Sequence, residues 1–214
     1  MMIRILALGL PLSMLAGCTS PVDLGPISSA TTSASSWVLY SSGSPSPEPS
    51  LANPPYLAAF GTFLPYRPGS TAITYDPAVV PPGATATLTM TRTGYGTEVH
   101  LEAIRLIPNR VYGAHLHINP CGADPEAAGS HYQNVQDPVT PSVNPAFANP
   151  SNEVWLDFTT SATGTGSATS RHGWDFDPVR RPRSLVLHAE RTMTAAGMAG
   201  KAGARVACLT LPAS

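Results

Sequence analysis

TATLTMTRTGYGTEVHLEAI, residues 85–104, is the stretch of sequence that decides the fold. Apolar and polar residues alternate from Thr85 to Met90 and again from Val99 to Ile104, with the turn residues Gly94-Tyr95-Gly96 between the two runs. Alternation with a period of two is typical of a half-buried strand, and a glycine-containing turn between two such runs is typical of a β-hairpin. This stretch therefore predicts a pair of antiparallel strands.

The rest of the C-terminal part follows the same pattern. Further short strands are expected at residues 111–118, 153–158, 167–172, 184–188 and 204–211. Residues 119–150 form a long stretch dense in proline, glycine and asparagine, and loops of this length inside a domain are usually functional. No strong amphipathic helix pattern interrupts the strands. The sequence therefore predicts an all-β protein, either a sandwich or a barrel.

Composition excludes some classes of function. The 214 residues include 23 prolines and 18 glycines, and only 12% are charged, with a formal net charge of −1. With so little net charge there is no basic field to attract a nucleic acid, so a nucleic-acid partner is not expected. The sequence has no apolar run of about 20 residues, so no membrane-spanning helix is expected.

The N-terminus has the features of an export signal. Arg4 precedes an apolar run, residues 5–17, that is too short to span a bilayer. The run ends in Leu15-Ala16-Gly17-Cys18, which resembles a bacterial lipoprotein lipobox. That resemblance implies a signal peptide over residues 1–17, acylation of Cys18 and lipid anchoring of the protein to a membrane of the cell envelope. The alternative is a plain secretion signal with an accidental cysteine; both alternatives predict an extracytoplasmic protein.

Residues 18–70 are rich in proline, serine and threonine and are predicted to tether a domain that spans residues 71–214. The run SPSPEPS at residues 44–50 is typical of an extended or polyproline II linker. The aromatic residues at 37–40 and 56–66 leave a second possibility open, an irregular arm packed on the domain. With Cys18 lipidated, Cys121 and Cys208 remain, and an exported protein allows a disulfide between them.

Two histidines stand at positions suited to a metal. In His115-Leu116-His117 the histidines are two residues apart, so on a strand they face the same side, about 6.6 Å apart along the chain. Two imidazoles at that spacing can converge on one ion. By itself the motif is also compatible with two exposed histidines on a solvated face.

The surroundings of this pair resemble a known family. Gly113-Ala114-His115-Leu116-His117 is followed by Cys121, by Gly129-Ser130-His131-Tyr132, by Leu185-Val186-Leu187-His188, and by GKAGARVAC at residues 200–208. This order of motifs, over about residues 82–212, resembles the copper/zinc superoxide dismutase family. The resemblance implies a Greek-key β-barrel or sandwich and a copper-dependent oxidoreductase that disproportionates superoxide.

The resemblance also implies roles for single residues. His115, His117, His131 and His188 match the copper ligands, and His131 matches the histidine that bridges copper and zinc and takes up a proton during turnover. Cys121 and Cys208 match the family's disulfide. Arg205 matches the arginine that guides the superoxide anion to the copper. Four imidazoles suit both Cu(II) and Cu(I).

The zinc site is where the sequence departs from the family. Residues 132–170 contain no histidine, and their acids are Asp137, Glu153 and Asp157, whereas a zinc site takes three or four nitrogen, sulfur or carboxylate ligands. The loop Ala189–Ala204 is also short, as in relatives without zinc. Zinc is therefore not expected, and the chain resembles the copper-only members.

Three remaining residues need a prediction. Glu153 has two interpretations, a hydrogen-bond acceptor that orients a ligand imidazole or a residue on a solvated face. His172, flanked by Arg171 and Gly173, and His100 are both expected at the surface.

The leading functional prediction is a copper-dependent superoxide dismutase. The alternatives are a copper-binding lipoprotein that buffers or delivers copper without turnover, and a degenerate structural domain. Arg205 favours the enzyme, since a copper store needs no guide for anions.

Overall fold

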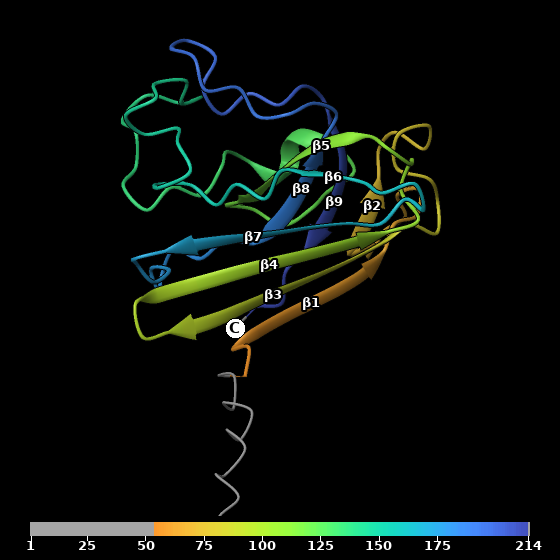
Figure 1. Ribbon diagram of the computed structural model, residues 1–214, viewed down its shortest axis with the longest axis horizontal. Helices are drawn as coiled ribbons and strands as arrows, with labels where there is room; N and C mark the ends of the chain where they lie inside the picture. Colours follow the sequence, from red (N-terminus) through yellow and green to blue (C-terminus); the bar gives the residue numbers. More distant parts are fainter. Residues whose placement is uncertain (1–53, 214) are drawn as a thin grey trace, which may run out of the picture. The chain divides into compact units, whose positions relative to one another are not determined.

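The computed structural model describes residues 54–213, and their regular structure is almost entirely β-strand (Figure 1). The only helical element in this range is one short 3-10 turn, η1 (Pro125–Ala128). The strands are β1 (Leu57–Thr62), β2 (Ala72–Thr74), β3 (Thr85–Thr93), β4 (Gly96–Ile104), β5 (Val111–His117), β6 (Phe158–Thr159), β7 (Gly166–His172), β8 (Ser184–His188) and β9 (Arg205–Thr210).

The first sheet contains the hairpin that the sequence predicts. Its strand order is β1-β3-β4-β7, and every neighbouring pair is antiparallel. The β3–β4 register runs without a shift from Thr85 opposite Ile104 to Thr93 opposite Gly96. Leu88 and Leu101 on the inner face are fully buried, as the alternation requires.

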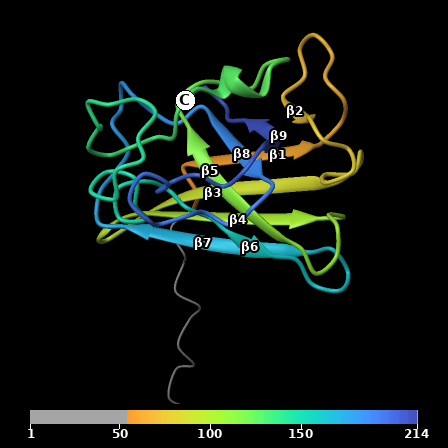
Figure 2. The same ribbon diagram turned by 90° about the horizontal axis from the view of Figure 1, so that it is seen from above.

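The second sheet carries the histidine motifs. Its order is β2-β9-β8-β5-β6, again antiparallel throughout. Figure 2 shows β5 and β8 running across the strands of the first sheet rather than along them. The two inner faces enclose the main core, which includes Phe63, Tyr112, Leu116, Leu156, Leu185, Leu187 and Leu209.

The fold is therefore an all-β sandwich, as predicted. The closed barrel named as the other possibility is wrong. β1 and β7 are the edges of one sheet, and β2 and β6 are the edges of the other. Where the two sheets meet at β2, the described residues form one backbone bridge, from Leu64 just after β1 to Ile73 on β2, which is too short to close the sheets into a barrel.

The folded part begins earlier than the predicted boundary at residue 70. β1 lies inside the stretch assigned to the tether, yet all six of its residues pair with β3, from Leu57 opposite Met90 to Thr62 opposite Thr85. Gly61 packs so closely that a Cβ there would lie 2.5 Å from that of Ala72. Residues 57–62 therefore pack on the domain, as the second possibility had it, but as a regular strand of the sheet and not as an irregular arm. The signal peptide, Cys18 and the tether up to residue 53 lie outside the described residues.

The predicted strand at 153–158 is also wrong in its extent. Only Phe158 and Thr159 form a strand, while the preceding residues make isolated bridges, Trp155 with His115 and Glu153 with Gln133. The alternation itself holds from Val154 to Phe158, and only Glu153 departs from it, because its side chain is buried.

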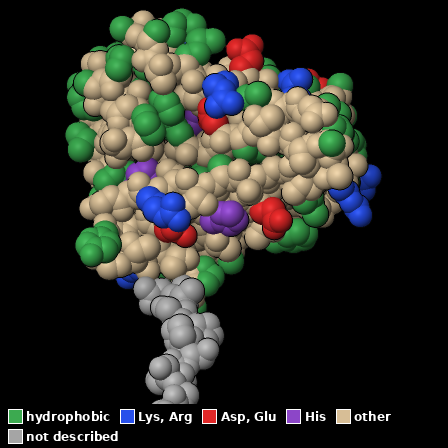
Figure 3. Space-filling view, viewed as in Figure 1, with side chains coloured by type: hydrophobic (Ala, Val, Ile, Leu, Met, Phe, Trp, Pro, Cys, Tyr) green, Lys and Arg blue, Asp and Glu red, His purple; other side chains and the backbone are tan. Residues whose placement is uncertain are grey.

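The surface carries few charges. On the face seen in Figure 3, charged side chains are scattered among uncharged ones, in keeping with the composition. No helix within residues 54–213 is long and apolar enough to cross a membrane.

Candidate metal centre

Four histidines, from two strands of the second sheet and the loop after β5, converge at one place. His115 and His117 lie on β5, His188 ends the neighbouring β8 opposite Gly113, and His131 is brought in by a bridge to His117. Each of the four histidines offers a ring nitrogen, and these four nitrogens all lie within 4.8 Å of one another. The pair on β5 therefore faces a common centre and not solvent.

Two of the imidazoles are oriented by backbone carbonyls. His117 Nδ1 lies 3.0 Å from the oxygen of Gly129, and His188 Nδ1 makes a longer contact of 3.5 Å with the oxygen of Gly203. A carbonyl oxygen only accepts, so the proton of each neutral ring is on Nδ1. The two Nε2 atoms then face each other with bare lone pairs at 3.4 Å. A cation between them would relieve this repulsion.

His115 is oriented by a relay of two side chains. Its Nε2 lies 2.7 Å from Thr192 Oγ1, and that hydroxyl lies 2.6 Å from Asp157 Oδ1. Because Thr192 gives its proton to the carboxylate, its oxygen accepts from Nε2–H of His115. Nδ1 is then left with a lone pair, and this atom is buried without a hydrogen-bond partner. Such an orphaned acceptor fits a metal ligand.

His131 is oriented by a carboxylate. Glu153 Oε2 accepts from His131 Nδ1 at 2.8 Å and from Trp155 Nε1 at 2.7 Å, and its Oε1 accepts from Gln133 Nε2 at 2.8 Å. The Glu153 side chain is only 2% exposed. Of the two interpretations of Glu153, the hydrogen-bond acceptor is therefore correct, and the solvated face is not.

Burial keeps three of these imidazoles neutral. Desolvation lowers the pKa of His115 and His117 well below the ordinary value, and it lowers that of His188 to about 3; the charge of His131 acts in the same direction. At neutral pH these rings therefore have lone pairs available for a metal. The donor set fits copper in either oxidation state, although imidazole also binds zinc, iron and nickel.

Arg205 lies beside this cluster. It is opposite His188 in the β8–β9 ladder, and its charge lowers the pKa of that histidine further. The guanidinium donates to the oxygen of Pro125 at 3.1 Å and pairs with Glu126 at the same distance. Arg205 lines a cleft of about 300 Å³ whose wall also includes His131, His188 and Lys201.

The predicted disulfide between Cys121 and Cys208 is present. It ties the long loop after β5 to β9, close to Arg205. The same loop holds η1 and His131. The long stretch 119–150 thus contributes residues to the site, in line with the expectation that a loop of this length is functional.

The two other histidines of the described chain stay outside the cluster. His100 is exposed, as predicted, and contacts Thr169 Oγ1 at 2.9 Å. His172 was expected at the surface, and that prediction is wrong. The residue is only 6% exposed, because β7 alternates and position 172 faces inward with Ser170, whose hydroxyl lies 2.8 Å from Nε2.

Sequence reasoning missed the parts of the site that act through other residues. Thr192 has no motif around it, and Asp157 looked like one of the outward residues of a strand. Among these supporting residues only Glu153 was singled out in the sequence, as a possible hydrogen-bond acceptor for a ligand imidazole.

Comparisons with known proteins give matches to structures only. A scan against protein-family models finds no match, and a search of curated proteins finds none either. Among solved structures, Cu/Zn superoxide dismutase from Brucella abortus has 20% identity, covering 72% of this chain and 97% of its own, with a TM-score of 0.48. A SOD-like protein from Bacillus subtilis has 15% identity, covering 72% of this chain and 100% of its own, with a TM-score of 0.43. A double mutant of that protein has 20% identity, covering 59% and 88%, with a TM-score of 0.43. At these identities the matches concern the fold and carry no argument about activity.

Proposed function

We propose that the protein is a copper-dependent superoxide dismutase, which converts two superoxide anions and two protons into O2 and H2O2. The observation that carries the proposal is the set of four converging imidazoles, with their ring nitrogens within 4.8 Å, beside a guanidinium. Bound copper would supply a one-electron couple that takes an electron from one superoxide and gives it to the next. His115, His117, His131 and His188 would hold it.

The residues around the histidines keep this ligand set fixed. His115 and His117 are fully buried, and each imidazole has one nitrogen held from outside the cluster. Outer partners of this kind typically fix the tautomer and ring orientation of ligating histidines. With the rings held in place, little rearrangement is needed between the two oxidation states of the metal.

His131 is the ligand best placed to carry a proton. It is the most exposed of the four and lines the cleft, and its Nδ1–H is held by Glu153, which leaves Nε2 as the other ring nitrogen. When Nε2 is not engaged, it can take up a proton, and the Glu153 carboxylate would stabilise the resulting imidazolium. That proton is available to the product peroxide.

We also propose that copper is the only metal. The support is the position of Glu153, which already holds Nδ1 of His131, the atom that a second metal on the outer side would need. Elemental analysis of the purified protein should find about one copper per chain and no stoichiometric zinc. One tight zinc per chain beside the copper would overturn this part of the proposal.

Arg205 provides the test that separates an enzyme from a copper store. Its charge stands at the cleft, so it can draw in and orient a small anion. Arg205→Ala should lower the rate constant for superoxide about tenfold or more, since steering by charge spans roughly 10- to 1000-fold. Copper content and the Cu(II) spectrum should stay unchanged. The matched control is Arg67→Ala, which removes an exposed arginine of the β1–β2 connection.

The wild-type rate should also fall with added salt, because the Debye length shrinks to about 10 Å at 0.1 M. Copper binding with no superoxide decay above that of the free buffer would instead favour the buffering or delivery protein. A wild-type rate in Arg205→Ala at low ionic strength would remove the guide role.

We further propose that the protein is anchored by lipid at Cys18 in the cell envelope, outside the cytoplasm. The support is the sequence Leu15-Ala16-Gly17-Cys18 after an apolar segment. Cys18→Ser should move the protein from the membrane fraction to the soluble fraction. Continued fractionation with membranes would contradict anchoring at this residue.

A further inference from the structure

A second pocket lies at the start of β1. It has a volume of about 380 Å³ and shares no lining residue with the cleft beside Arg205. Its wall combines Tyr56 and Leu57 with residues of the segment 176–183, FDPVRRPR, which leads into β8. The proposed copper chemistry makes no use of this pocket.

Arginines give the pocket its charge. Four of the chain's twelve basic residues line it: Arg92, Arg180, Arg181 and Arg183. Two carboxylates stand beside it, Asp175 at 3.9 Å from Arg92 and Asp177 at 3.9 Å from Arg180. Four guanidiniums against two carboxylates leave an excess of positive charge. Because the whole chain has a net charge of −1, this excess is local, and it favours an anion at this place.

The guanidinium of Arg183 is available to a ligand. Arg183 is exposed, and within residues 54–213 no hydrogen bond or ion pair engages its side chain. Its backbone is fixed from two sides, because its N–H donates to the oxygen of His117 and its oxygen accepts from the N–H of Leu211, each at 2.8 Å. The Arg180 guanidinium, in contrast, donates to the backbone oxygens of Gln133 and Asn134. Arg183 therefore offers free donors from a fixed position, and Arg180 adds mainly its charge.

Tyr56 adds a hydroxyl close to two of the arginines. The Arg92 guanidinium carbon lies 5.4 Å from the centroid of the Tyr56 ring. Burial raises the pKa of the Tyr56 hydroxyl, while the charges of Arg92 and Arg181 lower it, so both guanidiniums lie near this group. The hydroxyl keeps its proton at neutral pH, and its contact with Met90 Sδ at 3.8 Å is weaker than a bond to an anionic oxygen. It can therefore donate to a bound anion.

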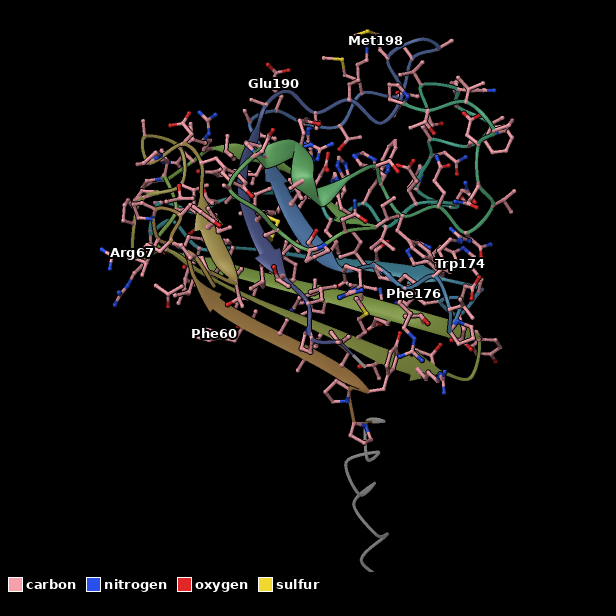
Figure 4. All side chains as sticks on the ribbon, turned by 180° about the vertical axis from the view of Figure 1, so that it is seen from behind. Phe60, Arg67, Trp174, Phe176, Glu190 and Met198 are labelled. Carbon is pink, nitrogen blue, oxygen red and sulfur yellow. A yellow bond between two sulfur atoms is a disulfide. The ribbon has the colours of Figure 1, made fainter. Side chains whose placement is uncertain are left out.

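The inner wall of the pocket is apolar. Leu57, Met90 and Phe176 line it and are buried, and Figure 4 shows Phe176 inside the sandwich. Val179 also lines the pocket and is 94% exposed. Small-molecule sites typically combine apolar walls with a few polar groups that fix the orientation of the ligand. A ligand with an anionic group and an apolar body can therefore use both kinds of wall.

We propose that this pocket binds a phosphate monoester carried on an apolar body. At neutral pH such a group carries a charge of about −1.5 to −2, and its three terminal oxygens can accept from several guanidiniums and from Tyr56 together. A carboxylate offers one charge and two oxygens, so it matches this set of donors less well. The ligand can be a soluble organic phosphate or a lipid with a phosphate headgroup. The site does not depend on the proposed copper chemistry.

The test uses the full chain with Cys18→Ser and three soluble probes of similar size: phenyl phosphate, benzoate and benzyl alcohol. Calorimetric titration should show one site that binds phenyl phosphate more tightly than the other two probes. The methyl signals of Val179 in nuclear magnetic resonance spectra should shift with phenyl phosphate. Arg183→Glu should weaken its binding about tenfold or more, because a repulsion replaces a charge-assisted hydrogen bond.

Two controls assign the binding to this pocket. Arg67→Glu makes the same change of charge at an exposed residue, which Figure 4 shows at the other end of the sandwich from Phe176, and it should bind like the wild type. Arg205→Ala should also bind like the wild type, since Arg205 lines the cleft and not this pocket. Circular dichroism should show all variants folded.

Three results would overturn the proposal. Equal binding of phenyl phosphate by the wild type and Arg183→Glu would remove the pocket's role, and loss of binding in Arg205→Ala would assign the anion to the cleft. Benzoate that binds as tightly as phenyl phosphate would refute the assignment to phosphate.

Vesicles distinguish the two sources of the phosphate. With a lipid source, the same chain should sediment with phosphatidylcholine vesicles that contain phosphatidic acid, but not with phosphatidylcholine alone. Phenyl phosphate should then release it. With a soluble source, the chain should bind phenyl phosphate and sediment with neither vesicle. Sedimentation with phosphatidic acid that persists in Arg183→Glu would contradict binding of the lipid in this pocket.

Discussion

The two sheets of the sandwich perform different work with different kinds of structure. The four-stranded sheet is long and regular, with strands of up to nine residues joined by a tight turn, and its inner face is apolar. The five-stranded sheet has shorter strands and long connections; it carries three histidines of the cluster, and the loop after β5 carries the fourth, His131. The first sheet thus supplies most of the stable base, and the second sheet and its loops supply the chemistry.

The difference lies in what fixes each side chain. Leu101 is held by packing against many apolar neighbours, so no single partner decides its position. Glu153 and Thr192 lie in irregular segments and are held by a few hydrogen bonds. Substitutions in the regular sheet should therefore change stability, whereas substitutions in the loops should change metal binding.

The largest effect on stability is expected at the regular sheet. Leu101→Ala removes a fully buried side chain from the main core, so the free energy of unfolding should fall by about 2–5 kcal/mol. Urea unfolding measures this change. The copper spectrum should stay the same, and the adjacent exposed Glu102→Ala should change stability by less than about 0.5 kcal/mol. An altered copper spectrum in Leu101→Ala would contradict the view that the first sheet affects stability and not the metal site.

Glu153→Gln should have the largest effect on the metal among the supporting residues. The substitution keeps the shape but removes the buried charge that faces His131. Loss of such an outer partner typically costs about 10- to 100-fold in metal affinity. Competition with a copper chelator measures it, with Glu102→Gln as the control for lost charge. Equal affinities in the two variants would show that Glu153 is not a support of the site.

Thr192→Val should have a smaller effect of the same kind. It breaks the relay from His115 to Asp157 while leaving the shape of the side chain nearly unchanged. We expect copper affinity to fall about tenfold, at the lower end of such effects, because the carboxylate acts on His115 indirectly. Thr192→Ser retains the hydroxyl and should bind copper like the wild type. If Val and Ser behave alike, packing and not the relay positions His115.

The smallest effect concerns pH and a histidine outside the cluster. Burial lowers the pKa of His172 from 6.5 to about 4, so below pH 6.5 the unfolded chain binds a proton that the folded protein rejects. This residue should therefore cost stability as the pH falls from 6.5 toward 4, by about 1 kcal/mol at pH 5.5. Urea unfolding of the metal-free protein at pH 7 and 5.5 should show a smaller loss in His172→Gln. An equal loss in both proteins would contradict the prediction.

The regular sheet was easier to predict from the sequence than the loops. The hairpin of residues 85–104 was predictable because alternation is a local property. β1 was missed because its small residues, Ala58 and Ala59, lie in a stretch whose composition is that of a linker. His172 did have a signal, since it continues the inward positions of β7, but its polar neighbours outweighed it.

The site was predictable where a motif names the residue. The four histidines and both cysteines stand in such motifs, and the structure brings them together. Thr192 and Asp157 could not be found in this way, because they meet through a contact 35 residues apart in the chain that no local pattern records. Hydrogen bonds that support a site depend on how loops close, which a single sequence does not show.

The disulfide makes the position of the Arg205 side chain depend on the redox state of two cysteines. Cys121 lies just before η1, whose Pro125 and Glu126 hold the Arg205 guanidinium, and Cys208 lies three residues beyond that arginine. Oxidation of the two thiols thus links the η1 loop, which binds the guanidinium, to β9, which carries the arginine. When the disulfide is reduced, the η1 loop and β9 lose this covalent link, and the Arg205 guanidinium is less firmly held at the cleft. The bond therefore couples the fixed position of this positive charge to the redox state of the two cysteines, so that the reduced protein would have its four histidines but a less firmly held guanidinium at the cleft.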